Sequence, residues 1–109
     1  MAIQHKSLAA GKWRQFSLAE QMGHIGSETS RALKWKDKDE MLYQNALTRA
    51  LELLDLTIQD PRWRKRLKEL LRVREVLGDV ILGGKEYKSS LADLNRYFFH
   101  FAYAVRARH

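Results

Sequence analysis

The sequence predicts an all-α protein: an antiparallel up-down-up-down four-helix bundle with a short basic N-terminal arm. Apolar residues recur at three- and four-residue spacing along most of the 109 residues, which is the period of an amphipathic helix. No run alternates Val, Ile or Thr with polar residues, as a half-buried strand would. Helix start and stop signals divide the chain into four stretches with short connections, so successive helices should run antiparallel.

Residues 1–16 are expected to form a flexible basic arm, and the first helix is expected over 17–36. In the stretch SLAE, Ser17 can cap the helix while the side chain of Glu20 reaches back to the backbone of Ser17, which is a capping box. The apolar stripe of this helix consists of Leu18, Met22, Ile25, Thr29, Ala32 and Leu33.

The second helix is expected over 39–59. Asp37 is the expected N-cap, since Glu40 follows it three residues later. The apolar positions of this stretch cover more than half of the helix circumference, so we expect the helix to contact more than one neighbour.

The third helix is expected over 61–82, and the fourth over 90–107. Asp60 is the expected N-cap of the third, with Pro61, the only proline, at the first position, where a missing N–H costs nothing. Gly83 and Gly84 should end this helix in a left-handed conformation. Ser89 or Ser90 should cap the fourth helix. Its apolar stripe consists of Leu91, Leu94, Phe98, Phe101, Ala102 and Val105.

Length and composition indicate one small globular domain, with 45% hydrophobic and 30% charged residues. The chain has no cysteine, which excludes disulfides, thiolate metal sites and cysteine nucleophiles. It shows neither a signal peptide nor an apolar stretch of about 18 residues, so we expect a cytoplasmic protein without membrane contact. No cofactor is expected. The histidines are too scattered for a metal site: His5, His24, His100 and His109.

The net charge of +7 is concentrated on the third predicted helix and the chain ends. The core stripe of this helix is expected to contain Trp63, Leu67, Leu70, Leu71, Leu77 and Ile81. Basic residues surround the stripe: Arg62, Arg64, Lys65, Arg66, Lys68 and Arg72. Such a fan of cations is typical of contacts to the phosphate backbone of RNA or DNA. The alternative is a solvated helix face with ion pairs such as Lys65–Glu69.

Arg74 falls in the middle of the predicted core stripe of the third helix. A buried guanidinium without a carboxylate partner would be very costly. We expect a structural ion pair between Arg74 and Glu28, with Asp79 as the second choice of partner.

The fourth predicted helix has aromatic residues around most of its circumference. One bundle cannot bury all of them, so part of the ring surface is left for a partner. Tyr97, Phe99 and Tyr103 are the expected contacts of a homo-oligomer interface, since aromatic residues are enriched in interfaces. Stacking on nucleobases or on another protein is the alternative.

Arg96 and His100 lie one turn apart on the outward side of the same helix. This pair resembles the motif of the HEPN ribonucleases, in which an arginine is followed, after four to six residues, by a histidine, and catalysis is completed across a dimer. Here three residues intervene, and Tyr97 stands where the family usually has a polar residue. The resemblance implies Arg96 and His100 as catalytic residues of an RNA-cleaving dimer.

Two longer runs, FSLAEQMGHIGSETSRALKWK and ALELLDLTIQDPRWRKRLKELLRVREVLGD, resemble a group of short uncharacterised bacterial four-helix-bundle proteins. This resemblance implies the fold and no particular activity. We therefore expect a non-enzymatic basic bundle that self-associates and binds nucleic acid or a nucleic-acid-processing partner. The alternatives are a HEPN-like ribonuclease and a protein-interaction module similar to an antitoxin.

Overall fold

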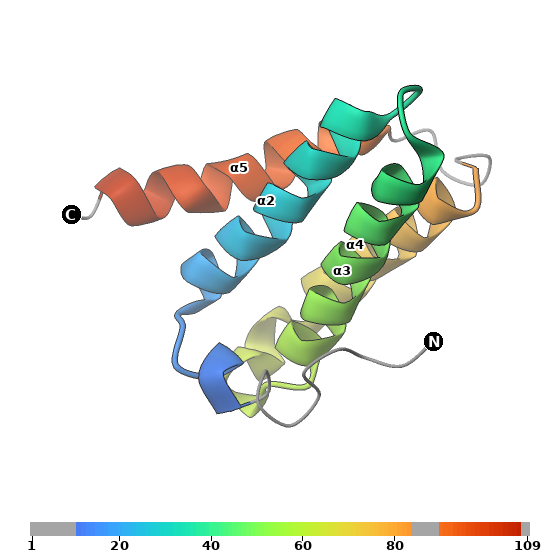
Figure 1. Ribbon diagram of the computed structural model, residues 1–109. Helices are drawn as coiled ribbons and strands as arrows, with labels where there is room; N and C mark the ends of the chain where they lie inside the picture. Colours follow the sequence, from blue (N-terminus) through green and yellow to red (C-terminus); the bar gives the residue numbers. More distant parts are fainter. Residues whose placement is uncertain (1–10, 84–89, 108–109) are drawn as a thin grey trace.

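The computed structural model describes residues 11–83 and 90–107, and every regular element in these ranges is helical (Figure 1). The elements are α2 (Leu18–Trp35), α3 (Glu40–Ile58), the 3₁₀ helix η1 (Pro61–Arg66), α4 (Leu67–Ile81) and α5 (Leu91–Ala107). The all-α prediction is therefore confirmed.

The N-terminus of α2 has the predicted capping box, but that of α3 has a different cap. Ser17 Oγ accepts from the backbone N–H of Glu20 at 3.1 Å, and the N–H of Ser17 donates to Glu20 Oε1 at 2.9 Å. At α3 the cap is Asp39, whose Oδ1 accepts from Leu42 N at 3.0 Å. The prediction of Asp37 is wrong because Asp37 has a φ of 64° and turns the chain between the helices, whereas an N-cap needs an extended backbone.

The third predicted helix consists of two elements, η1 and α4. Asp60 is the N-cap, as predicted, and its Oδ1 accepts from Arg62 N at 3.0 Å, with Pro61 next in the chain. The backbone departs from helical geometry at Trp63, with φ −102° and ψ 22°. A 3₁₀ helix turns about 20° more per residue than an α-helix, so faces read from one continuous helix are rotated by the end of η1.

Ser90 caps α5 in the manner of a capping box. Its Oγ accepts from Asp93 N at 3.2 Å, and its N–H donates to Asp93 Oδ2 at 3.0 Å. One of the two predicted caps is thus confirmed, and Ser89 lies outside the described residues. Gly83 has the predicted left-handed conformation, with a φ of +116°.

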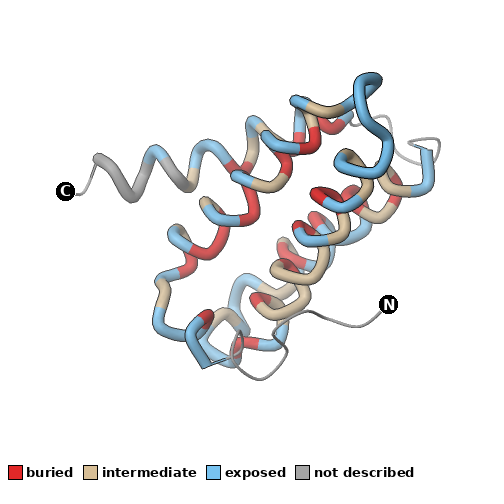
Figure 2. Tube along the Cα trace, viewed as in Figure 1, coloured by how far each residue is buried: buried red, intermediate tan, exposed pale blue. Residues whose placement is uncertain are grey.

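Helix α2 has α3 along one side and α5 along the other, while α4 packs on α3 and more sparsely on α5 (Figure 1). Buried positions recur along the sides of the helices that face one another (Figure 2). The core includes Met22, Ile25, Leu47, Leu54, Leu70, Leu77 and Phe98. Gly26 permits close contact of α2 with α5, since a Cβ added there would lie 2.8 Å from Phe98 Cβ.

Candidate nucleic-acid interface

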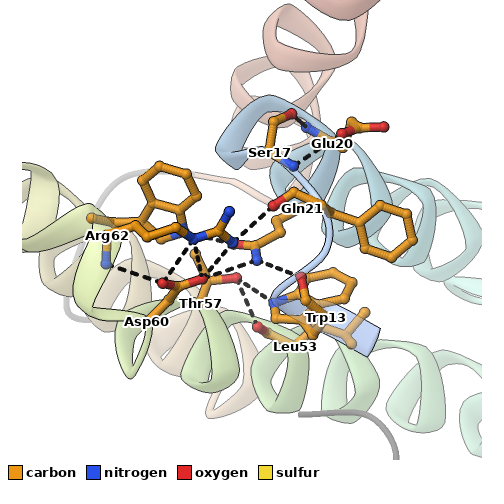
Figure 3. Close-up of polar contacts among 10 residues, drawn as sticks. Trp13, Ser17, Glu20, Gln21, Leu53, Thr57, Asp60 and Arg62 are labelled. Atoms are coloured by element: carbon orange, nitrogen blue, oxygen red, sulfur yellow. Dashed lines mark hydrogen bonds and ion pairs between the residues drawn. The ribbon is translucent and has the colours of Figure 1, made fainter. Parts of the chain in front are cut away.

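Trp13 holds the segment 11–16 against one end of the helices. Its side chain is 6% exposed, and its Nε1 donates to Thr57 Oγ1 in α3 at 2.9 Å. Gln21 Nε2 in α2 donates to the carbonyl oxygen of Trp13 at 2.8 Å (Figure 3). The predicted flexible arm is therefore wrong for residues 11–16, because a buried tryptophan and its hydrogen bonds fix this segment. Residues 1–10 of the predicted arm lie outside the described residues.

The buried carboxylate of Asp60, 2% exposed, connects this segment with η1. Arg62 Nη2 donates to Asp60 Oδ2 at 2.7 Å and to the carbonyl oxygen of Phe16 at 2.9 Å (Figure 3). The hydrogen bonds from Arg62 hold the pKa of Asp60 below its usual value, although burial alone would raise it. Residues 11–16 and η1, far apart in sequence, thus lie at the same end of the molecule.

The amide of Gln21 completes this network. It is fully buried, its Nε2 lies 3.5 Å from Asp60 Oδ2, and its Oε1 accepts from Trp63 Nε1 at 2.9 Å. No buried side-chain nitrogen or oxygen in the described part of the chain lacks a hydrogen-bond partner. Because the network is fully satisfied, it rigidifies the end of the molecule that carries the basic residues.

Two of the six predicted nucleic-acid-binding residues, Arg62 and Arg66, form ion pairs and ring contacts within the chain. The guanidinium of Arg62 lies 4.4 Å from the centre of the Trp63 ring while it binds Asp60. Arg66 Nε donates to Glu69 Oε1 at 2.8 Å, and its guanidinium lies 5.8 Å from the centre of the Phe101 ring. Both arginines are therefore sandwiched between a carboxylate and an aromatic ring.

Three others, Arg64, Lys65 and Lys68, are exposed and form no ion pair with any residue in the described ranges. Lys12 and Arg14, on the segment held by Trp13, are exposed in the same way. These five residues lie at the end of the molecule where residues 11–16 meet η1 and the start of α4 (Figure 1), and we call them the basic end. The remaining predicted residue, Arg72, borders a groove of about 300 Å³ between α4 and α5.

The carboxylates next to the basic end are already engaged. Asp60 is bound by Arg62, and Glu69 accepts from both Arg66 and the hydroxyl of Tyr97, the latter at 2.5 Å. The hydrogen bond from Arg66 is the main cause that holds the pKa of Glu69 below its usual value. The positive charge of the basic end is therefore not neutralised by these neighbours.

The predicted pair of Arg74 with Glu28 is wrong. Arg74 Nε lies 2.6 Å from Asp55 Oδ1 in α3, and the Arg74 side chain is 46% exposed. Glu28 instead accepts from Arg31 Nη1 at 2.7 Å. The error lies in the predicted stripe itself. Leu71, also predicted in the stripe, is 43% exposed, and the buried apolar residues of α4 are Leu70, Val73, Val76 and Leu77.

The three predicted oligomer contacts on α5 have different surroundings. Phe99 is 57% exposed and Tyr103 is 67% exposed. Tyr97 instead packs within the chain, since its hydroxyl donates to Glu69 and its ring lies 5.4 Å from that of Phe101 in an edge-to-face contact. Burial, followed by the hydrogen bond to Glu69, raises the pKa of Tyr97 well above its usual value.

Arg96 and His100 are both exposed on α5. Arg96 Nη1 lies 3.5 Å from Asp93 Oδ1, an ion pair within the first turns of the helix. Their catalytic role in an RNA-cleaving dimer stays a prediction.

Among the described residues, no group of three or more His, Asp or Glu side chains could hold a metal ion. No helix in the same ranges is long and apolar enough to cross a membrane. Comparisons with protein-family models, with curated proteins and with solved structures found no match to this chain.

Proposed function

We propose that this protein is a non-enzymatic binding module that contacts the phosphate backbone of nucleic acid through its basic end. One observation carries the proposal: five exposed cations, none in an ion pair with the described residues, lie at one end of the fold. The nearby carboxylates Asp60 and Glu69 are already bound by Arg62 and Arg66. Exposed Lys and Arg side chains of this kind bind the phosphates of nucleic acid, and the release of counterions condensed on the nucleic acid makes this binding favourable.

The burial of Trp13 supports the inclusion of Lys12 and Arg14. A flexible arm would lose conformational entropy on binding, whereas residues 11–16 are already ordered by the hydrogen bonds of Trp13 and Arg62. The cations of both segments are thus arranged before a ligand arrives, which lowers the cost of association.

The proposal takes the four α-helices as an antiparallel up-down-up-down bundle. Short connections, such as the one between Trp35 and Glu40, support this arrangement. In such a bundle the basic end lies opposite the connection between α2 and α3, where Lys36 and Lys38 are exposed. These two lysines therefore provide a matched control for charge effects that do not depend on position.

The test is the affinity for a labelled duplex of about 20 base pairs, measured by fluorescence anisotropy. Arg64→Glu with Lys68→Glu should weaken binding about 30-fold at roughly 0.15 M salt, because each lost phosphate contact costs about fivefold by counterion release. Lys36→Glu with Lys38→Glu, which changes the charge equally, should weaken binding much less. Equal losses in both variants would show that the basic end is not the contact surface.

We further propose that the chain self-associates through Phe99 and Tyr103. Phe99 borders a hollow of about 280 Å³ between α2 and α5, whose lining residues are all uncharged, among them Gly23, Ser27 and Asn95. The net charge of +7 makes copies of the chain repel one another, so an uncharged face with exposed rings is where two copies can meet at the lowest electrostatic cost.

Sedimentation velocity tests this interface. The protein should sediment as a dimer, and Phe99→Ser with Tyr103→Ser should convert it to a monomer. Leu71→Ser with Leu82→Ser removes two exposed leucines elsewhere, and this control should remain dimeric. A specific interface should have a dissociation constant of about 1 μM or below, so the protein should be dimeric at about 100 μM. A wild-type protein that is still monomeric at this concentration would contradict the proposal.

A further inference from the structure

We propose that the basic end binds double-stranded nucleic acid in preference to single strands, an inference that rests on the proposed function. Proteins that bind single strands without sequence preference combine cations with aromatic rings on which the bases stack. The state of the rings around the basic end therefore decides between the two kinds of ligand.

The rings next to the basic end are engaged within the fold. Trp13 is buried and donates to Thr57. Trp63 donates to Gln21 through its Nε1 and is covered on one face by the guanidinium of Arg62, at 4.4 Å from the ring centre. A base that stacks on this face of Trp63 would have to displace a guanidinium that the buried Asp60 holds in place.

The same arrangement recurs at the start of α4. Arg66 lies over the Phe101 ring and is held there by Glu69, which also accepts from the hydroxyl of Tyr97. Displacing Arg66 would break a charge-assisted hydrogen bond, and such bonds are stronger than neutral ones. In both places a carboxylate keeps an arginine over the ring, where a single strand would need to place a base.

The exposed rings of the described residues lie on the other side of α5. Phe99 and Tyr103 are each two positions from Phe101, which is about 200° around an α-helix. Since Phe101 faces Arg66, the rings of Phe99 and Tyr103 point away from the basic end. A strand whose phosphates contact the basic end would leave these two rings behind the helix.

Cations without stacking rings favour the ligand with the higher charge density. A DNA duplex carries one negative charge per about 1.7 Å of its axis. The logarithm of the association constant falls linearly with the logarithm of the salt concentration, and each neutralised phosphate contributes about 0.9 to this slope for a duplex, against about 0.7 for a single strand. For five contacts this difference corresponds to roughly sevenfold tighter duplex binding near 0.15 M salt. The basic end therefore fits the regular phosphate rows of a duplex.

The experiment compares four labelled ligands of the same length: a DNA duplex, an RNA duplex and one unstructured single strand of each. The two duplexes test which nucleic acid supplies the phosphate rows. We expect at least one duplex to bind about sevenfold more tightly than its own single strand. We also expect the duplex-to-single-strand ratio to be unchanged in Phe99→Ala with Tyr103→Ala, even if that variant changes self-association.

Two results would overturn the duplex preference: single strands that bind as tightly as duplexes, or a single-strand affinity that falls selectively in the Phe99 and Tyr103 variant. Either result would leave backbone binding by the basic end in place, because Arg64→Glu with Lys68→Glu would still lower the affinity for both duplexes and single strands. Absence of binding to all four ligands at low salt would instead refute the proposed function itself, and the duplex preference with it.

Discussion

Replacing Trp13 with alanine should lower the free energy of unfolding by about 3–5 kcal/mol, the usual cost of truncating a buried aromatic side chain. The indole is almost fully buried, and it packs edge-to-face on Phe16 with 5.9 Å between ring centres. Its loss also removes the hydrogen bond to Thr57, in the middle of a buried polar network. Urea denaturation followed by circular dichroism measures the change.

Trp13→Phe is the matched control. It keeps a large ring and loses the bond from Nε1 to Thr57, so its cost should be smaller than that of Trp13→Ala, by the packing that remains. Unchanged stability in Trp13→Ala would contradict the assignment of residues 11–16 to the folded domain.

Removal of the Asp60 carboxylate should have the second largest effect on stability. Asp60→Ala should cost about 2–4 kcal/mol, because it removes an N-cap and charge-assisted hydrogen bonds at the same time. The carboxylate accepts from the side chain of Arg62 and from its backbone N–H, and Gln21 lies within 3.5 Å. Since Asp60 and Trp13 both contact Gln21, the two substitutions should not be additive.

The same carboxylate should make stability depend on pH. The pKa of Asp60 is lower in the folded protein than in the unfolded chain, chiefly because of the hydrogen bonds from Arg62. The contribution of Asp60 to the free energy of unfolding is therefore present above the unfolded-state pKa and is lost as the pH falls through the folded-state pKa. Asp60→Asn should be less stable than the wild type at neutral pH, and this difference should shrink below about pH 5. A difference that stays constant down to about pH 3 would contradict this.

The helical class and most helix ends follow from local sequence. The caps at Ser17, Asp60 and Ser90 involve residues two or three positions away, so a short window of sequence contains everything that determines them. Asp37 was the wrong choice of N-cap because two aspartates precede this helix, and each has a possible partner three residues later. The chain turns at Asp37, so Asp39 caps the helix.

The buried face of α4 differs from the predicted one because it includes valines that the predicted stripe omitted. A stripe drawn through the leucines of α4 puts Arg74 in the core. The structure instead buries Val73 and Val76 beside Leu70 and Leu77. Arg74 lies at the border of this buried face and reaches outward to Asp55 on α3, a partner that the helical period of α4 alone does not reveal.

The candidate site was predicted in part. Composition alone identified the basic residues around Trp63, but not which of them the fold already uses. Arg62 and Arg66 differ from Arg64 and Lys68 in that each binds a carboxylate and lies over an aromatic ring. One of these rings, that of Phe101, comes from a helix far along the chain. The role of Trp13 was missed because its partner Thr57 lies 44 residues away.

The salt dependence of duplex binding tests the central claim most directly. If the five cations of the basic end each contact a phosphate, the logarithm of the association constant should fall with the logarithm of salt concentration with a slope of about −4.5. In Arg64→Glu with Lys68→Glu the slope should shrink to about −2.7, because two contacts are lost. A slope near zero, or one that this variant leaves unchanged, would contradict backbone binding by the basic end.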